Sequence, residues 1–194
     1  MRLYKAANWQ WQGVDGMSVL ELPHSRMPPP PTPFDPVDLR HAFASFATGV
    51  TIITARDTAG HPVGLTANSF GSVSLDPPLV QWSLRVNSGL YRFFVEAPHF
   101  GVSVLTADQA LIARQFASRL PDRFAGIALV DSPGEPPLIC DALAHFVCRK
   151  INDLRVGDHE LFVGEIVRAA AHSGTPLIFH ESQFTTVAAH TRLA

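Results

Sequence analysis

Charge is scarce in this chain of 194 residues, because only 16% of them are Asp, Glu, Lys or Arg and the formal net charge is −2. A protein that grips a nucleic-acid backbone needs clustered lysine and arginine, and the sequence has no such cluster. It also has no window of roughly 18 apolar residues, the length that a membrane-spanning helix requires. We therefore expect neither a nucleic-acid partner nor a membrane span.

Cysteine is equally scarce, since Cys140 and Cys148 are the only two. They form no CxxC pair, which favours two reduced thiols that pack as small apolar groups. Arg2 and Lys5 near the N-terminus are not followed by the apolar run of a secretory signal, so we expect a cytoplasmic protein. A metal site is not expected either, because Val163 replaces the second histidine that His159 would need for an HExxH motif.

Residues 1–34 differ from the rest of the chain and are predicted to form a proline-rich N-terminal arm. Residues 27–33 are mostly proline, so they favour an extended polyproline conformation and exclude a helix. The arm could drape over the domain or over a neighbouring subunit, or be partly disordered, and Met17 or Met27 could be the true start. Residues 35–194, in a chain that is 46% hydrophobic, are expected to form one domain with a full core.

Helices are predicted at only three places in this domain. The first begins with Asp35 as N-cap and Pro36 at the first helical position, and Gly49 is expected to end it. Ser88 is predicted to cap a short second helix. Thr106 with Gln109 resembles a capping box, which begins a third helix that runs to about Ala117. Leu39, Phe43 and Phe46 fall on one face of the first helix. The second helix carries Leu90, Phe93 and Phe94, and the residues expected to face inward from the third are Leu111, Ile112 and Phe116.

The remaining apolar stretches are short and separated by turn residues. A turn at residues 57–60 joins two of them into a hairpin. Many short strands with few helices predict a mainly β protein built as an antiparallel barrel. The predicted strands are residues 50–55, the strand from Pro62, and residues 79–84, 100–105, 142–153, 161–171, 176–179 and 184–187.

The most informative segment is Gly64–Phe70, with the sequence GLTANSF. It combines small hydroxyls and an amide with little bulk, so a large, flat, polar ligand could lie against it. The segment contains neither a carboxylate nor a cysteine. We therefore expect cofactor binding there rather than chemistry by protein side chains.

Several motifs in a fixed order resemble the flavin reductase domain family, the small reductase component of two-component flavin-dependent monooxygenases. The resemblance covers Leu39 to Val187. The motifs that carry it are FATGV at 46–50, GLTANSF at 64–70, SVSLDPPL at 72–79, Ser83 with Asn87-Ser88, Arg123-Phe124, and Gly157-Asp158-His159 leading into LFVG at 161–164.

This resemblance implies an FMN-binding split β-barrel, a homodimer with flavin near the subunit boundary, and reduction of FMN or FAD by NADH or NADPH. The reduced flavin would then diffuse to a separate monooxygenase. Two alternatives stay open. One is a tight flavin-binding electron carrier or sensor that does not release its flavin, and the other is an interaction module whose active part is the proline-rich arm.

The resemblance also implies which residues contact the cofactors. Those expected along the isoalloxazine edge are Thr66, Ala67, Asn68 and Ser69. Those expected near the ribityl chain and the phosphate are Ser83, Arg85, Asn87, Ser88, Arg123 and Phe124, with the two arginines as phosphate partners. Simpler roles are an outward-facing strand residue for Ser83, a plain N-cap for Ser88 and a solvated charge for Arg85.

The Gly157-Asp158-His159 motif is the second strong signal. The resemblance places His159 on the nicotinamide side of the flavin, as the candidate catalytic residue, with Asp158 among the cofactor-binding residues. The alternative is a histidine at a strand start that is bonded to Asp158 or to a backbone carbonyl. Glu181-Ser182-Gln183 departs from a family pattern of glycine and a basic residue, so no site role is assigned to it.

Overall fold

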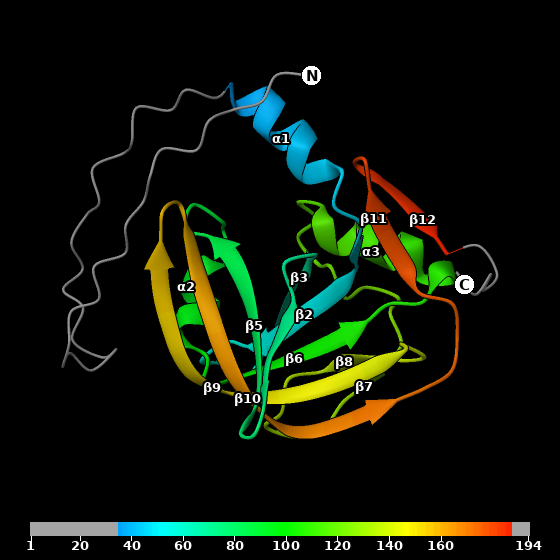
Figure 1. Ribbon diagram of the computed structural model, residues 1–194. Coiled ribbons are helices and arrows are strands. Elements are labelled where there is room, and N and C mark those ends of the chain that lie inside the picture. Colours follow the sequence, from blue (N-terminus) through cyan, green and yellow to red (C-terminus); the bar gives the residue numbers. More distant parts are fainter. Residues whose placement is uncertain (1–34, 188–194) are drawn as a thin grey trace. The chain divides into compact units, whose positions relative to one another are not determined.

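The structure is a computed structural model that describes residues 35–187, so the predicted arm at residues 1–34 lies outside the described residues. The helices are α1 (Pro36–Ala44), α2 (Tyr91–Glu96) and α3 (Ala110–Ala117), with a 3-10 turn η2 (Ala107–Gln109) before α3 (Figure 1). Within the described range, no helix is long and apolar enough to cross a bilayer.

Strands make up most of the domain, as predicted. The strands that the sequence indicated are β2 (Thr51–Arg56), β3 (Pro62–Ala67), β5 (Pro78–Arg85), β6 (His99–Val104), β9 (Ala144–Val156), β10 (His159–Ala171), β11 (Leu177–His180) and β12 (Gln183–Thr186). The sequence analysis missed four shorter ones, which are β1 (Thr48–Gly49), β4 (Gly71–Leu75), β7 (Leu129–Val130) and β8 (Leu138–Ile139).

The main sheet has seven strands in the order β3-β2-β6-β9-β10-β5-β4, and all its pairings are antiparallel. β3 and β4 are its two edges, yet only residues 68–70 separate them along the chain. A three-residue link cannot span far, so both edges meet at this end and the sheet curls into the split barrel predicted from the sequence (Figure 1). The predicted ligand-binding segment therefore lies where the barrel closes.

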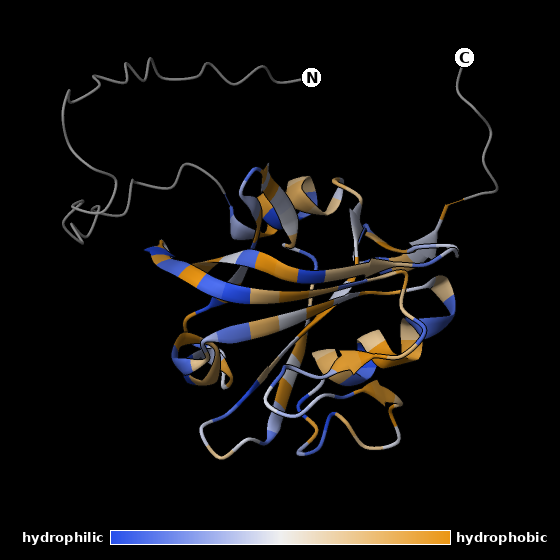
Figure 2. Cartoon of the chain, turned by 90° about the horizontal axis from the view of Figure 1, so that it is seen from below, coloured by the Kyte–Doolittle hydropathy of each residue, from blue (hydrophilic) through white to orange (hydrophobic). Residues whose placement is uncertain are grey.

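Alternation along β5 divides its side chains between the core and the opposite face. Trp82 is fully buried, whereas Ser83 is half-buried and Arg85 is exposed. The Trp82 ring stacks on Phe162 at 4.6 Å between ring centroids and meets Phe94 edge-on at 4.9 Å. Figure 2 shows the same alternation of hydrophilic and hydrophobic residues along the long strands.

A second core forms between α3 and the strands β2, β8 and β11, of which β11 belongs to a separate sheet of β1, β11 and β12. The predicted capping box is present, because Thr106 and Gln109 exchange side-chain and backbone hydrogen bonds at the start of η2. Phe116 is buried as predicted, but Leu111 is 78% exposed and Ala113 takes the buried position instead. The 3-10 turn before α3 rotates the helix face relative to the one expected for a single continuous helix.

The predicted first helix is shorter than expected. α1 ends at Ala44, and Gly49 belongs to β1, where it pairs with Ile178. None of the residues of α1 is buried, and Phe43 and Phe46 are 68% and 77% exposed. Of the three apolar residues predicted to share a helical face, Leu39 and Phe43 lie on α1 whereas Phe46 lies beyond its end, and all three are exposed rather than packed on the core.

The predicted capping role of Ser88 is also wrong. Leu90 is the N-cap of α2 and makes no side-chain capping bond. The Ser88 carbonyl accepts the backbone N–H of Tyr91, and its hydroxyl accepts the N–H of Leu90 at 3.3 Å. Ser88 therefore belongs to the turn between β5 and α2, two residues before the N-cap position.

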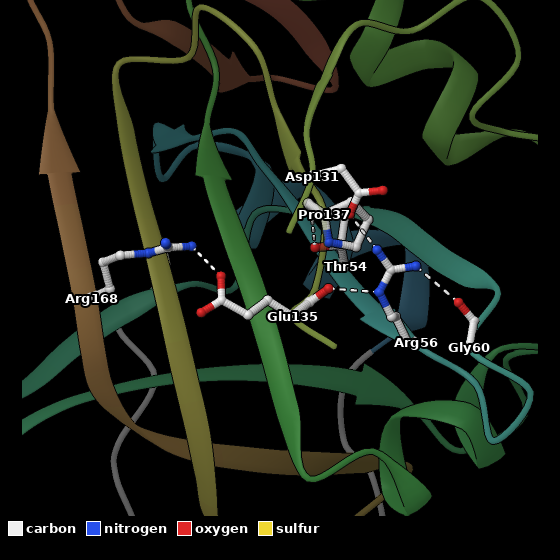
Figure 3. Close-up of polar contacts among 7 residues, drawn as sticks. All are labelled: Thr54, Arg56, Gly60, Asp131, Glu135, Pro137 and Arg168. Atoms are coloured by element: carbon white, nitrogen blue, oxygen red, sulfur yellow. Dashed lines mark hydrogen bonds and ion pairs between the residues drawn. The ribbon is translucent and has the colours of Figure 1, made fainter. Parts of the chain in front are cut away.

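A polar network holds the loop at residues 131–137 against the sheet (Figure 3). Arg56 on β2 donates Nε to the Glu135 carbonyl at 2.7 Å and forms an ion pair with Asp131. The Thr54 hydroxyl donates to the Pro137 carbonyl at 2.6 Å, and Arg168 on β10 pairs with the Glu135 carboxylate. These contacts tie the loop that precedes β8 to β2 and β10.

Both cysteines are free, and Cys148 is fully buried while Cys140 is half-buried. Burial raises the pKa of the Cys148 thiol from 9.0 to about 12. We expect a thiol reagent at pH 8 to label Cys140 but not Cys148 in the native protein, and both after denaturation. Because the folded state favours the neutral thiol, stability should fall as pH rises from about 9 toward 12. Labelling of both thiols in the native protein at pH 8 would contradict the predicted protection of Cys148.

Candidate active site

A cleft of about 620 Å³ opens at the end of the barrel where β3 passes into β4. Ten of the twelve predicted site residues line it, although they come from five separate stretches of the chain. These ten are Thr66, Ala67, Asn68, Ser69, Ser83, Arg85, Asn87, Ser88, Arg123 and His159.

In the predicted ligand-binding segment Gly64–Phe70, the side-chain hydroxyls of Thr66 and Ser69 form hydrogen bonds with the protein itself. Thr66 Oγ1 donates to the Ala113 carbonyl of α3 at 2.6 Å. The Ser69 hydroxyl donates to the Ser83 carbonyl at 3.1 Å and accepts the Ser83 N–H at 3.0 Å, which ties the β3–β4 link to β5. Asn68 is exposed and its side chain has no hydrogen-bond partner among residues 35–187, so its amide is available to a ligand.

Three arginines line the cleft, and they differ in how strongly the protein engages them. Arg85 pairs with Asp158 at 3.0 Å, and both side chains are exposed. Arg123 donates to the carbonyls of Ser118 and Gly64 at 2.9 and 3.1 Å. Arg119 is exposed and makes no ion pair in the described part of the chain. No carboxylate belongs to the lining, so the cleft favours an anion.

His159 begins β10 directly after the tight turn at Gly157, which has a φ of 61°. Its Nδ1 lies 2.7 Å from Asp158 Oδ1, which is the contact with Asp158 that the sequence analysis gave as the simpler role. Because His159 also lines the cleft, this contact orients the ring without removing it from the site. The carboxylate holds the proton on Nδ1 and leaves Nε2 for a ligand.

The Asp158 carboxylate is stabilised in its charged form. The hydrogen bond from His159 is the main cause that lowers its pKa below 3.8, and Arg85 contributes in the same direction. A lowered pKa adds stability that is present above the unfolded value and is lost as pH falls through the folded value. The orientation of His159 should therefore persist at any pH above about 4.

Two predicted residues do not line the cleft. The Phe124 ring meets Phe116 edge-on at 4.9 Å and lines a smaller adjoining hollow of about 260 Å³. Asp158 acts through its contacts with Arg85 and His159. The sequence analysis missed the contribution of the end of α3, which adds Phe116, Ser118 and Arg119 to the lining. A signal was present, since Arg119 stands two residues beyond the predicted end of the helix at Ala117 and four residues before Arg123.

The cleft suits an anionic ligand with a flat ring system. Its volume lies within the range of roughly 300–1,000 Å³ that is usual for cofactor sites. Apolar wall residues could contact a ring, and the arginines could bind a phosphate. Gly89 offers open space, because a Cβ built there meets no atom within 4 Å. The larger apolar members of the lining are Leu65, Leu84, Leu90 and Phe116.

Comparison with known proteins identifies relatives that use flavins. The model of the flavin reductase like domain matches residues 43–188. The chain is 43% identical over 145 residues to an FMN reductase (NADH), SmoA, of Agrobacterium fabrum, covering 75% of this chain and 82% of that protein. It is 37% identical over 152 residues to the reductase component of a 4-nitrophenol 4-monooxygenase/4-nitrocatechol 2-monooxygenase of Rhodococcus opacus, covering 78% and 81%.

Solved structures agree with these matches. The NADH:FAD oxidoreductase SgcE6 of Streptomyces globisporus, in complex with NAD and FAD fragments, superposes with a TM-score of 0.75 at 37% identity. The superposition covers 79% of this chain and 93% of that one. Some matched relatives are longer, and the chain spans 58% and 43% of two proteins of Rhizobium meliloti.

Proposed function

This chain belongs to the flavin reductase like domain family, and from that membership we infer that it transfers a hydride from NADH or NADPH to FMN or FAD. The observation that carries this function is the cleft itself. It brings together ten of the predicted residues, nine of them polar or cationic, around a space of about 620 Å³, and its lining contains no carboxylate or cysteine. A bound flavin accepts the hydride and a reduced nicotinamide supplies it, so the protein contributes binding and orientation.

We place the flavin ring against the β3–β4 link and its phosphate near the arginines. The side-chain amide of Asn68 has no partner among the described residues, and the backbone of Thr66–Ser69 offers further hydrogen-bond groups. The Thr66 and Ser69 hydroxyls bond to the protein instead and hold this segment against α3 and β5. Arg119 is the best phosphate partner, because Arg85 is paired with Asp158 and Arg123 supports the carbonyls of Ser118 and Gly64. This ranking differs from the sequence analysis, which proposed Arg85 and Arg123.

We assign His159 to the nicotinamide. Asp158 fixes the tautomer, so Nε2 can accept a hydrogen bond from a carboxamide or guide the ring. The His159 side chain is 39% exposed at the cleft, which leaves room for a second ligand above the flavin. His159 therefore positions the hydride donor and forms no covalent bond with it.

The reduced flavin is supplied to a monooxygenase partner, as is implied by relatives that are reductase components of monooxygenases. Asn68, Arg85, Asn87 and Arg119 are all exposed, which favours a flavin that enters and leaves. We further propose a cytoplasmic homodimer. The exposed apolar residues Leu39, Phe43 and Phe46 support an interface, and light scattering of the purified protein would test it.

The function is tested by NADH or NADPH oxidation with added FMN or FAD. We expect turnover that depends on added flavin and colourless protein after extensive dialysis. Protein that stays yellow after dialysis and oxidises NADH slowly would favour the alternative of an electron carrier that retains its flavin. Lack of turnover with both nucleotides and both flavins would overturn the proposed function.

Replacing Asn68 with leucine should weaken flavin binding about tenfold, because an apolar group replaces the unused amide at the ring edge. Fluorescence titration of FMN measures this change. Asn152→Leu is the matched control, since Asn152 is exposed on β9 and does not line the cleft. An unchanged FMN affinity in Asn68→Leu would show that the side chain does not contact the flavin.

A further inference from the structure

Glu160 is the only buried carboxylate among residues 35–187, with 7% of its surface exposed. It follows His159 directly and lies on the inward face of β10 with Phe162 and Gly164, where side-chain alternation favours an apolar residue. Burying a charged carboxylate costs free energy unless hydrogen bonds compensate it. Such a departure from the core pattern, next to a candidate active-site residue, indicates a role in that site.

The hydrogen-bond partner of Glu160 is Tyr91, the first residue of α2. Tyr91 Oη donates to Glu160 Oε2 at 2.9 Å, and this bond is the main cause that raises the pKa of the tyrosine above 10.0. The hydroxyl therefore stays protonated and donates at neutral pH. Glu160 forms no ion pair within the described part of the chain, so this bond fixes the orientation of its carboxylate.

The turn between β5 and α2 forms one wall of the cleft, which residues 87–90 line. At the start of the turn, the Val86 N–H donates to the Asp158 carbonyl at 3.1 Å. At its end, the Tyr91 side chain donates to Glu160. The start of β10 and the residue just before it therefore hold both ends of this wall.

Asp158 and Glu160 are the two neighbours of His159, so the histidine lies between the two anchors of the turn. In the function proposed above, residues 87–90 border the flavin and His159 contacts the nicotinamide. We propose that Tyr91 and Glu160 are positioning residues whose hydrogen bond fixes the flavin wall relative to the histidine. The proposal rests on the proposed function and deepens it, because it identifies what aligns the two ligands for hydride transfer.

Alignment has a large effect on hydride transfer, because the reacting atoms must approach to about 3–3.5 Å in the correct orientation. A displacement of about 1 Å can slow such a step on the order of 100-fold. The backbone bond of Val86 holds only the start of the turn. Loss of the Tyr91 hydroxyl would therefore free its end, where Gly89 and Leu90 line the cleft.

The rest of α2 is held independently of the Tyr91 hydroxyl. Phe94 is buried against Trp82, and Lys150 on β9 donates to the Phe94 carbonyl at 3.4 Å and to the Val95 carbonyl. A variant without the hydroxyl should therefore keep the helix and the fold, and lose only the fixed position of the turn before α2.

Stopped-flow reduction under anaerobic conditions tests the proposal at saturating FMN and NADH, or with the flavin and nucleotide that the wild type prefers. Tyr91→Phe removes the donor, Glu160→Leu removes the acceptor, and the double variant removes both. Thr54→Val is the matched control, because it removes a different hydroxyl bond, from Thr54 to the Pro137 carbonyl, outside the cleft (Figure 3). Circular dichroism during thermal unfolding measures the stability of each variant.

We expect Tyr91→Phe and Glu160→Leu each to slow reduction about tenfold, while the Kd of FMN and the KM of NADH change by less than about twofold. The double variant should be no slower than the slower single variant, since both substitutions remove the same bond. Glu160→Gln should recover most of the rate, because its amide oxygen still accepts a hydrogen bond from the tyrosine.

An unchanged rate in Tyr91→Phe would overturn the positioning role, and this variant decides the question even if Glu160→Leu does not fold. Losses that multiply in the double variant, an equal slowing in Thr54→Val, or a loss of FMN affinity as large as the loss of rate would also overturn it. A wild type that reduces neither flavin with either nucleotide would instead overturn the proposed function.

Discussion

Replacing Trp82 with alanine should lower the free energy of unfolding by about 4 kcal/mol, the largest stability effect that we expect from one substitution. Trp82 is completely buried between Phe162, Phe94 and Phe100, so truncation removes contacts with three rings and leaves a cavity. Urea denaturation followed by circular dichroism measures the change. Because β5 also carries Ser83 and Arg85, flavin affinity should fall together with stability.

Trp82→Phe provides the comparison for this prediction. The indole Nε1 is buried and has no hydrogen-bond partner among the described residues. Phenylalanine removes that unsatisfied donor while keeping a ring in the cluster, so its cost should be well below that of alanine. Equal losses for the two variants would show that the stacking of aromatic rings is not what stabilises this core.

Replacing His159 with alanine should slow flavin reduction by NADH about 100-fold while leaving flavin affinity nearly unchanged. The expectation follows because the flavin and the nicotinamide are proposed to contact different residues. In the arrangement proposed above, the flavin contacts the β3–β4 link and the arginines, whereas His159 enters the cleft from the start of β10 with its ring oriented by Asp158. Stopped-flow reduction under anaerobic conditions and a separate flavin titration measure the two effects.

His61→Ala is the matched control, because His61 also pairs with a neighbouring aspartate, Asp57, but lies outside the cleft. It should leave the reduction rate unchanged. Asp158→Asn should slow reduction less than His159→Ala, since the histidine remains while its tautomer is no longer fixed. Small and equal effects of His159→Ala on reduction and on flavin affinity would remove His159 from the mechanism.

Ten of the twelve predicted site residues line one cleft, and the segments that carry them are marked by local patterns. The β3 strand followed by small polar residues, and the tight turn before His159, can each be read within ten residues. Arg119 was missed because its place in the cleft depends on how α3 packs against β3 and β11. Local patterns also failed for α1, whose apolar stripe is spaced like a core face but is exposed.

By itself the sequence determined a mainly β domain, the hairpins, the capping box before α3 and the motif order of a flavin reductase. These follow from side-chain alternation, turn residues and short-range hydrogen bonds, which are set by neighbours along the chain. Only the tertiary structure decided which cleft residues are free. The hydroxyls of Thr66 and Ser69 bond to α3 and β5, and Arg85 pairs with Asp158, whereas the side chains of Asn68 and Arg119 remain available to a ligand. The reason is that hydrogen-bond partners far apart in the sequence meet only when the barrel closes.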